Sequence, residues 1–144
     1  MYSAVDWLYS KVPVRFPNLK ICMSEGGIGW VAGLLDRLEH CYRYQLGYLP
    51  TWRGIDLTPA EVLQRNFWFC AIDDQSGMHT RHRIGVENIL CESDYPHADS
   101  SWPDTQAQLR AHMEGFPPEE IRAMTWENAS RLFRHPVPPE LQIP

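Results

Sequence analysis

The sequence predicts an α/β domain built around a parallel sheet. Three short apolar segments, Leu19–Met23, Asn66–Ile72 and Asn88–Cys91, are rich in Ile, Phe, Trp and Cys and do not alternate cleanly with polar residues. Such segments are typical of strands covered on both faces. Helical patterns separate them, which favours right-handed crossovers between parallel strands. At 144 residues the chain can form one core, but it is shorter than the roughly 200 residues of the smallest complete eight-stranded β/α barrel.

Two helices are expected between the first and second strands. Val31, Leu34, Leu35 and Leu38 recur at helical spacing with charged residues between them. The segment Thr58–Glu61 combines an N-cap threonine, a proline at the first helical position and an acid at the third, which is a helix start signal. Together these helices form the crossover that would place the two strands parallel.

The remaining helices follow the second and third strands. Helical segments are predicted around His79 and His82, from near Asp104, from Pro117 and over Trp126–Phe133. We expect residues 1–135 to form one domain. Residues 136–144 contain four prolines and are expected to form a tail that wraps or frays.

Charge and hydropathy exclude several classes of partner. The sequence has 13 Lys and Arg against 18 Asp and Glu, a net charge of −5, which argues against nucleic-acid binding because phosphates need a basic face. No run approaches the roughly 18 apolar residues of a membrane span. The N-terminus lacks the features of a signal peptide, so we expect a cytoplasmic protein with no membrane partner.

The four cysteines, Cys22, Cys41, Cys70 and Cys91, form no C-x-x-C pair, and this spacing argues against a zinc knuckle or a haem attachment site. Three of them lie in apolar runs. The prediction is that they are buried, reduced thiols acting as small hydrophobic residues. A nucleophilic cysteine is the alternative, but no specific partner histidine is in view.

Acidic residues follow all three predicted strands, in the segments Ser24–Gly27, Asp73–Gln75 and Glu92–His97. In parallel α/β structures these positions share one edge of the sheet, where function collects. Carboxylates that converge repel each other unless a proton or cation lies among them. A divalent metal with carboxylate and imidazole ligands would resolve this repulsion. The alternative is that Asp73, Asp74 and Asp94 simply cap the helices that follow.

Side-chain alternation adds a constraint at this edge. Because residues two apart in a strand share a face, Glu92 should point the same way as Asp94, and Met23 the same way as Glu25. An inward-facing Glu92 would need a cationic partner or a raised pKa. Gly26–Gly27 permits either close backbone approach to a substrate or an ordinary strand-to-helix turn.

Four segments carry a resemblance to a known family: Arg15–Trp30, Arg65–Asp74, Ile84–Asp104 and Glu127–Phe133. The most specific is the motif S-D-Y-P-H followed by D-S-S-W-P. Through these segments the chain resembles the C-terminal part of the amidohydrolase-related proteins, which include aminocarboxymuconate-semialdehyde decarboxylase and related non-oxidative decarboxylases. The resemblance implies the last three β/α units, about strands six to eight, of a TIM-barrel metal-dependent hydrolase, and therefore an incomplete barrel.

The resemblance also implies site roles. Family members hold one divalent metal, usually zinc, that activates water or polarises the substrate. Asp94 matches the aspartate that sits at the metal and handles protons, so it is the expected metal ligand and catalytic residue. Glu25 stands where many members have an active-site histidine, and is the second expected catalytic residue. His97 and Gly26 are expected to contact substrate, although His97 could instead stabilise the Asp99–Trp102 turn.

The other histidines and Trp102 are expected to have no catalytic role. His40, His112 and His135 should be surface residues, and His79 and His82 should lie on the helix before the last strand. Trp102 is expected to pack against the start of the helix that begins near Asp104.

The family's His-x-His pair after strand one and its histidine after strand five have no counterpart in this sequence. We therefore expect a fragment or truncated reading frame with an incomplete ligand set, inactive without the missing N-terminal half. The whole enzyme would act on a small organic substrate by hydrolysis, or on a carboxylated one by non-oxidative decarboxylation. A non-catalytic remnant or interaction module is the alternative. Homo-oligomers, or association with the missing half, are the expected partners.

Overall fold

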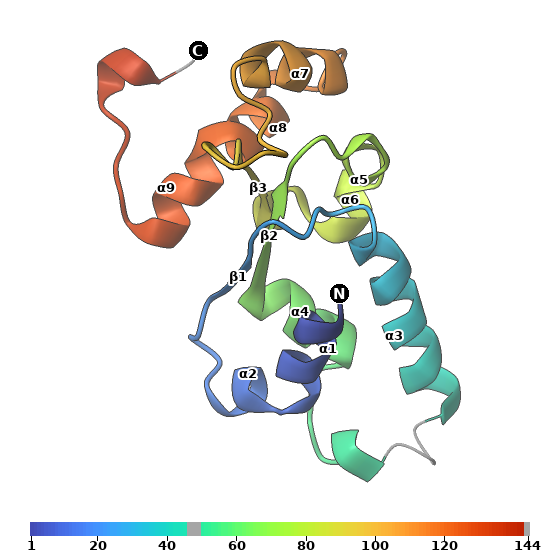
Figure 1. Cartoon of the computed structure of the whole chain (residues 1–144). Helices are drawn as coiled ribbons and strands as arrows, with labels where there is room; N and C mark the ends of the chain where they lie inside the picture. The colour runs from blue at the N-terminus through green and yellow to red at the C-terminus, as the bar shows by residue number, and fades with distance from the viewer. Residues whose placement is uncertain (46–49, 143–144) are drawn as a thin grey trace.

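A parallel sheet of three short strands lies at the centre of the computed structural model, which describes residues 1–45 and 50–142. The strands lie in the order β1 (Ile21–Met23), β2 (Phe67–Ala71) and β3 (Ile89–Cys91), as Figure 1 shows. Main-chain register pairs Ile21 with Phe67 and Phe69 with Ile89. The three predicted strands and their parallel direction are confirmed, although each is one or two residues shorter than predicted.

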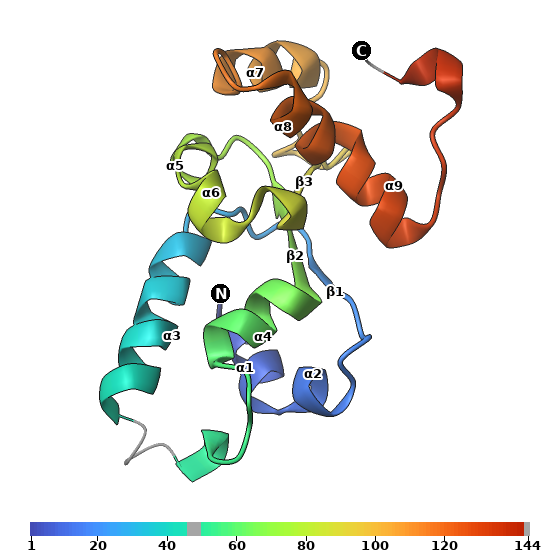
Figure 2. The same cartoon turned by 180° about the vertical axis from the view of Figure 1, so that it is seen from behind.

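Nine α-helical segments surround the sheet in the described part of the chain: α1 (Tyr2–Tyr9), α2 (Val12–Arg15), α3 (Val31–Gln45), α4 (Pro59–Asn66), α5 (Gln75–His79), α6 (Arg81–Ile84), α7 (Thr105–His112), α8 (Pro118–Arg122) and α9 (Asn128–Phe133). Figure 2 shows α1, α2 and α4 near the start of β2, and α7, α8 and α9 beyond β3. The helix predicted around His79 and His82 is two short helices. The helix predicted over Trp126–Phe133 continues α8 through the π-helical turn Ala123–Glu127.

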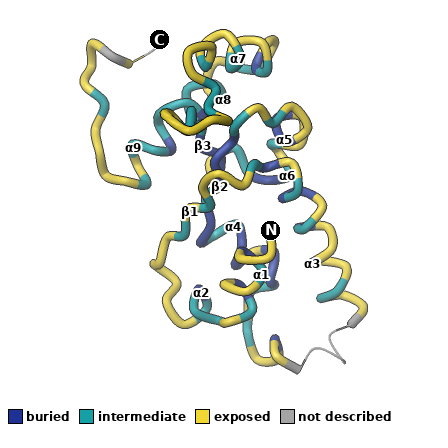
Figure 3. The backbone as a smooth tube through the Cα atoms, viewed as in Figure 1, coloured by how far each residue is buried: buried dark blue, intermediate teal, exposed yellow. Residues whose placement is uncertain are grey.

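The two faces of the sheet differ in what covers them. Phe67 and Phe69 of β2 are buried in the main core with residues of α3 and α4, and their rings stack 6.4 Å apart. Trp68 and Cys70 alternate with them and therefore point to the opposite face. This second face is only partly covered: Cys70 is buried, but its neighbour Cys22 on β1 is exposed. Figure 3 shows that β2 is mostly buried and that β1 is more exposed.

Three buried asparagines connect the amino ends of the strands. Asn66, Asn88 and Asn128 are the buried polar residues of the described chain. Each side-chain amide donates to two backbone carbonyls at the entry to the preceding strand. These bonds run from Asn66 to Pro17 and Leu19, from Asn88 to Gln64 and Phe67, and from Asn128 to Val86 and Ile89, at 2.7–3.1 Å. Each β/α unit is thereby tied to the one before it.

The helix start predicted at Thr58 is confirmed. The backbone N–H of Glu61 donates to the Thr58 hydroxyl at 3.2 Å, and the backbone N–H of Thr58 donates to the Glu61 carboxylate at 2.7 Å. These two bonds form a capping box. The pKa of Glu61 is lowered, first because its carboxylate accepts the hydrogen bond from the Thr58 backbone N–H and second through the Thr58 side chain.

None of the helices in residues 1–45 and 50–142 combines the length and the apolar character needed to cross a bilayer.

We predict that Asn88→Ala lowers the free energy of unfolding by about 2 to 4 kcal/mol, because two buried carbonyls lose their donor. Urea unfolding at low protein concentration would measure the change. Asn18→Ala is the matched control, since Asn18 is exposed, and it should change stability by less than about 0.5 kcal/mol. Equal effects of the two substitutions would show that the buried amide does not hold the strand entries.

Candidate functional site

Each strand is followed by one non-glycine residue in the left-handed backbone region. These residues are Glu25 (φ 59°), Asp73 (φ 49°) and Asp94 (φ 55°). Such residues are uncommon, and strained backbone concentrates at functional sites. The left-handed turn also ends the strand alternation. Met23 packs against the helix-covered core, whereas Glu25 is exposed, and the expectation that these two side chains share a face stays a prediction.

Glu25, Asp94 and His97 come together at the carboxyl edge of the sheet. One potential ligand atom of each lies within 4.8 Å of the others. In residues 1–45 and 50–142 they form the one group of three or more His, Cys, Asp or Glu residues that meets this condition. Asp94 is the sheltered member, with its side chain 13% exposed against 61% for His97. The expectation that Asp94 and Glu25 face the same space therefore agrees with the structure, and their catalytic roles remain predictions.

The imidazole of His97 is coupled to Asp94. Its Nδ1 lies 3.0 Å from Asp94 Oδ2. This hydrogen bond, followed by the charge of Asp94, raises the pKa of His97 above its ordinary value, with smaller contributions from Glu25 and Asp99. The carboxylate thus favours the protonated imidazole, and His97 can hold a proton next to Asp94 at a higher pH than an isolated histidine would.

Glu92 links the carboxyl ends of β1 and β3. Its Oε2 accepts a hydrogen bond from the Ser24 hydroxyl, and its Oε1 accepts one from the backbone N–H of Glu25, both at 2.7 Å. In the described part of the chain, these two neutral donors take the place of the cationic partner that alternation suggested. The bond to the Glu25 backbone fixes the turn that carries the Glu25 carboxylate, so Glu92 is a positioning residue. The sequence pattern singled out Glu92 but did not identify its hydrogen-bond partners.

Asp73 and Asp74 do not cap the helix that follows β2. Asp74 occupies the N-cap position of α5, but its side chain makes no capping bond. It accepts instead from the backbone N–H groups of Ile72 at 3.1 Å and Gly29 at 3.3 Å. Asp73 Oδ1 lies 3.2 Å from His112 Nε2. Asp74 therefore closes its own turn and joins it to the loop after β1.

His112 was wrongly expected at the surface, since its side chain is only 18% exposed. The ring lies at the end of α7, next to the turn after β2. The contact of His112 with Asp73 joins residues far apart in the chain, so no local sequence pattern predicts it.

Gly27, in the loop after β1, is a position at which the backbone geometry requires glycine. Its φ is +60°, and a Cβ added there would lie 2.8 Å from Asp74 Oδ1. A Cβ on Gly26 would meet only the Ser24 carbonyl oxygen at 3.8 Å, an ordinary contact. The carbonyl of Gly26 accepts a hydrogen bond from Trp30 Nε1 at 3.0 Å. Gly26 lies beside Glu25, and its contact with substrate stays a prediction.

Two exposed aromatic rings belong to the segment that follows β3, and sequence reasoning missed the pair. Tyr95 and Trp102 are 66% and 63% exposed, and their rings meet edge to face with centroids 5.6 Å apart. The Trp102 ring therefore lies against Tyr95 and solvent, and the expectation that it packs against the start of α7 stays a prediction. Both residues belong to the motif around Asp94, which is the signal that could have suggested their proximity.

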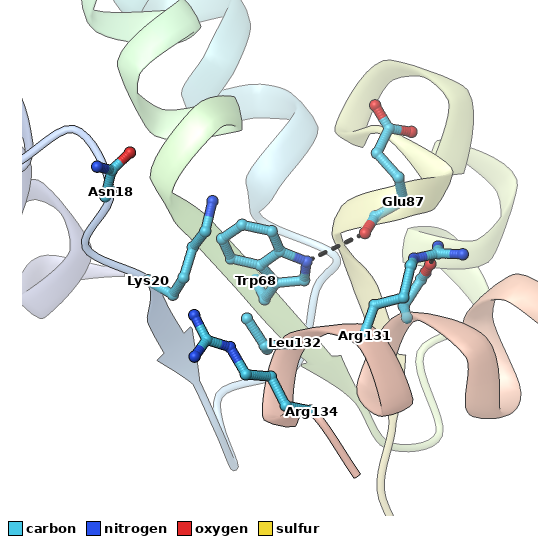
Figure 4. Close-up of a pocket in the computed structure, with 8 residues that line it drawn as sticks. Asn18, Lys20, Trp68, Glu87, Arg131, Leu132 and Arg134 are labelled. Carbon is cyan, nitrogen blue, oxygen red and sulfur yellow. Dashed lines mark hydrogen bonds between the residues drawn. The ribbon is translucent and has the colours of Figure 1, made fainter. Parts of the chain in front are cut away.

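The cavity shown in Figure 4 lies elsewhere. It has a volume of about 350 Å³ and is lined by Asn18, Lys20, Trp68, Glu87, Asn128, Arg131, Leu132 and Arg134. Lys20 Nζ lies 4.7 Å from the centre of the Trp68 ring, and Trp68 Nε1 donates to the Glu87 carbonyl at 3.1 Å. None of the three clustered residues lines it. The basic cavity and the acidic cluster are therefore separate features.

Comparison with known proteins finds a protein family and solved structures that are similar to this chain. A protein-family model described as amidohydrolase matches residues 3–135. An amidohydrolase from Mycobacterium avium subsp. paratuberculosis has a similar structure, with a TM-score of 0.73 and 28% identity, over 90% of this chain and 32% of that one. The 5-carboxyvanillate decarboxylase LigW from Sphingomonas paucimobilis has a TM-score of 0.72 and 25% identity, over 91% of this chain and 38% of that one. The chain thus spans about a third of each structure. No curated protein matches its sequence.

We predict that nuclear magnetic resonance titration finds the pKa of His97 above about 6.5, and that Asp94→Asn returns it toward that value. Asp99→Asn, the control, should lower it less, because Asp99 contributes least. Since the folded-state pKa is raised, this pair stabilises the fold fully below the unfolded-state pKa and loses that effect as the pH rises through the folded-state pKa. An ordinary pKa in the unsubstituted chain would contradict the coupling.

Proposed function

Because this chain belongs to the amidohydrolase family, we propose that it forms the last three β/α units, about strands six to eight, of a metal-dependent β/α-barrel enzyme. The parallel sheet and the much greater length of both structural neighbours support this proposal. The whole enzyme would act on a small organic substrate by hydrolysis, or by non-oxidative decarboxylation of a carboxylated one. One neighbour is an amidohydrolase and the other a decarboxylase, so both reactions have support.

The observation that carries the proposal is the convergence of Glu25, Asp94 and His97 within 4.8 Å. Two carboxylates and an imidazole suit a divalent cation such as zinc. A cation would also relieve the repulsion between the carboxylates. We assign Asp94 as a metal ligand, with Glu25 and His97 as weaker candidates. When bound, such an ion polarises a substrate carbonyl or lowers the pKa of a water molecule.

The chain's own residues would then divide the remaining work. Asp94 is sheltered and oriented by His97, which suits it to hold or move a proton at its carboxylate. Glu25 is positioned through its backbone by Glu92 and supplies a second acid–base group. His97 and the exposed Gly26 would contact the substrate from the two loops that carry these acids.

In a full-length enzyme containing this chain, Asp94→Asn should lower turnover by about two orders of magnitude or more, the usual scale for a lost acid–base group. Asp99→Asn is the control, because Asp99 is an exposed acid on the same loop and should leave turnover unchanged. Steady-state kinetics would measure both variants. Unchanged turnover in Asp94→Asn would overturn the assigned role.

The 144-residue chain alone should bind zinc weakly and show no turnover. A catalytic zinc site ordinarily needs three protein ligands in fixed geometry, and the family's histidine ligands have no counterpart in this sequence. Metal analysis after dialysis should find less than one equivalent, and Asp94→Asn should reduce it further than Asp99→Asn. One tightly held equivalent would contradict the proposed incomplete ligand set. If metal analysis found no metal in a full-length protein, the result would favour the alternative that the chain is a non-catalytic remnant.

The purified chain should also self-associate. Within the described residues, β1 and β3 each have a strand neighbour on one side only, and unpaired strand edges template association. Light scattering should find oligomers or aggregates. Cys22→Lys, which puts a charge on the open face of an edge strand, should reduce their size. Phe16→Ser should not, because Phe16 is an exposed ring outside the strands. A stable monomer of the unsubstituted chain would contradict this prediction.

A further inference from the structure

We propose that Cys22 and Cys70 form a dithiol that reacts with hydroperoxides and closes to a disulfide on the open face of the sheet. The two Sγ atoms lie 3.6 Å apart. This site is distinct from the cluster of Glu25, Asp94 and His97. The inference does not depend on the metal chemistry proposed above, and it concerns the 144-residue chain itself, because a completed barrel would enclose this face.

The strand register brings the two thiols together. Cys22 of β1 pairs with Trp68 of β2, so Cys70 lies two residues further along the neighbouring strand. Residues two apart in a strand share a face. Trp68 and Cys70 therefore point to the side of the sheet on which Cys22 lies, and the two cysteine side chains lean toward each other across the strand pair. A contact set by main-chain pairing persists while the sheet is folded.

The two thiols differ in exposure and in pKa, and these differences assign their roles. Cys22 is exposed, whereas Cys70 is 6% exposed. The hydrogen bond between the two thiols lowers the pKa of Cys22 and raises the pKa of Cys70. An accessible, thiolate-prone cysteine beside a second thiol is the arrangement that oxidants select. Cys22 is therefore the attacking residue and Cys70 the resolving one.

The chemistry needs a hydroperoxide as the oxidant. The Cys22 thiolate attacks one peroxide oxygen, so an S–O bond forms, the O–O bond breaks, and hydroxide leaves and takes up a proton. The Cys70 sulfur, on losing its proton, attacks the sulfenic sulfur of Cys22. An S–S bond then forms, the S–O bond breaks, and a second water leaves. The two thiols are oxidised by two electrons, and with hydrogen peroxide the product is two molecules of water.

The other two cysteines provide internal controls. Cys41 lies on α3, away from this strand pair. Cys91 is packed against the helix-covered core, and burial raises its pKa to about 12, which disfavours the reactive thiolate. Neither should react as the proposed pair does.

The test treats the reduced chain with hydrogen peroxide at low protein concentration, removes the peroxide, and blocks remaining thiols in denaturant. Intact-mass and peptide analysis should find that two of the four thiols are lost and that Cys22 is linked to Cys70 within one chain. Cys41→Ser and Cys91→Ser should retain this linkage. Cys22→Ser and Cys70→Ser should each abolish it.

The single variants also test the order of events. In Cys70→Ser, a dimedone probe should capture sulfenic acid at Cys22, and in Cys22→Ser it should capture none at Cys70. Oxidation in urea should lose the preference for this pair, because strand register no longer holds the thiols together. The proposal is overturned if the folded chain forms only cross-links between chains, if Cys41 or Cys91 reacts first, or if Cys22 passes to sulfinic acid without a disulfide.

Discussion

Three buried side-chain amides hold the amino ends of the strands, and the rest of the structure depends on them. The strands have only three to five residues each, so main-chain pairing alone offers few hydrogen bonds. Asn66, Asn88 and Asn128 each add two bonds to the entry of the preceding strand. They thereby fix the register. A slip of one residue would exchange the faces of every strand side chain, moving Phe69 out of the core and separating Cys22 from Cys70.

The carboxyl ends of the same strands carry the polar chemistry. With register fixed at one end, the turns after β1 and β3 leave the sheet at defined positions, and left-handed residues redirect both. Glu92 then spans from β3 to the turn after β1. This contact holds Glu25 near Asp94 despite the like charges of their carboxylates. The sheet thus separates stability at its amino end from chemistry at its carboxyl end, a division typical of β/α folds.

Along the strands, the open face of the sheet carries first basic groups, then two thiols and then a carboxylate. The basic cavity around Trp68 and Lys20 lies toward the strand entries, the contact between Cys22 and Cys70 comes next, and Glu92 follows at the carboxyl edge. In a closed barrel this face would point inward, so each layer would meet the strands that complete the barrel. Positive and negative charge therefore collect at opposite ends of one short sheet.

The sequence alone determined the α/β class, the three strands, the capped helix start at Thr58 and the proximity of Glu25 to Asp94. These features follow from local patterns: apolar runs, capping residues, and the common edge at which parallel strands end. Only the tertiary structure decided that Glu92 is satisfied by residues 67 and 68 positions away, that His112 packs against the turn after β2, and that Cys22 is exposed. Contacts across such distances depend on strand order and on how loops bend after a left-handed residue, and neither is encoded in the spacing of neighbouring residues.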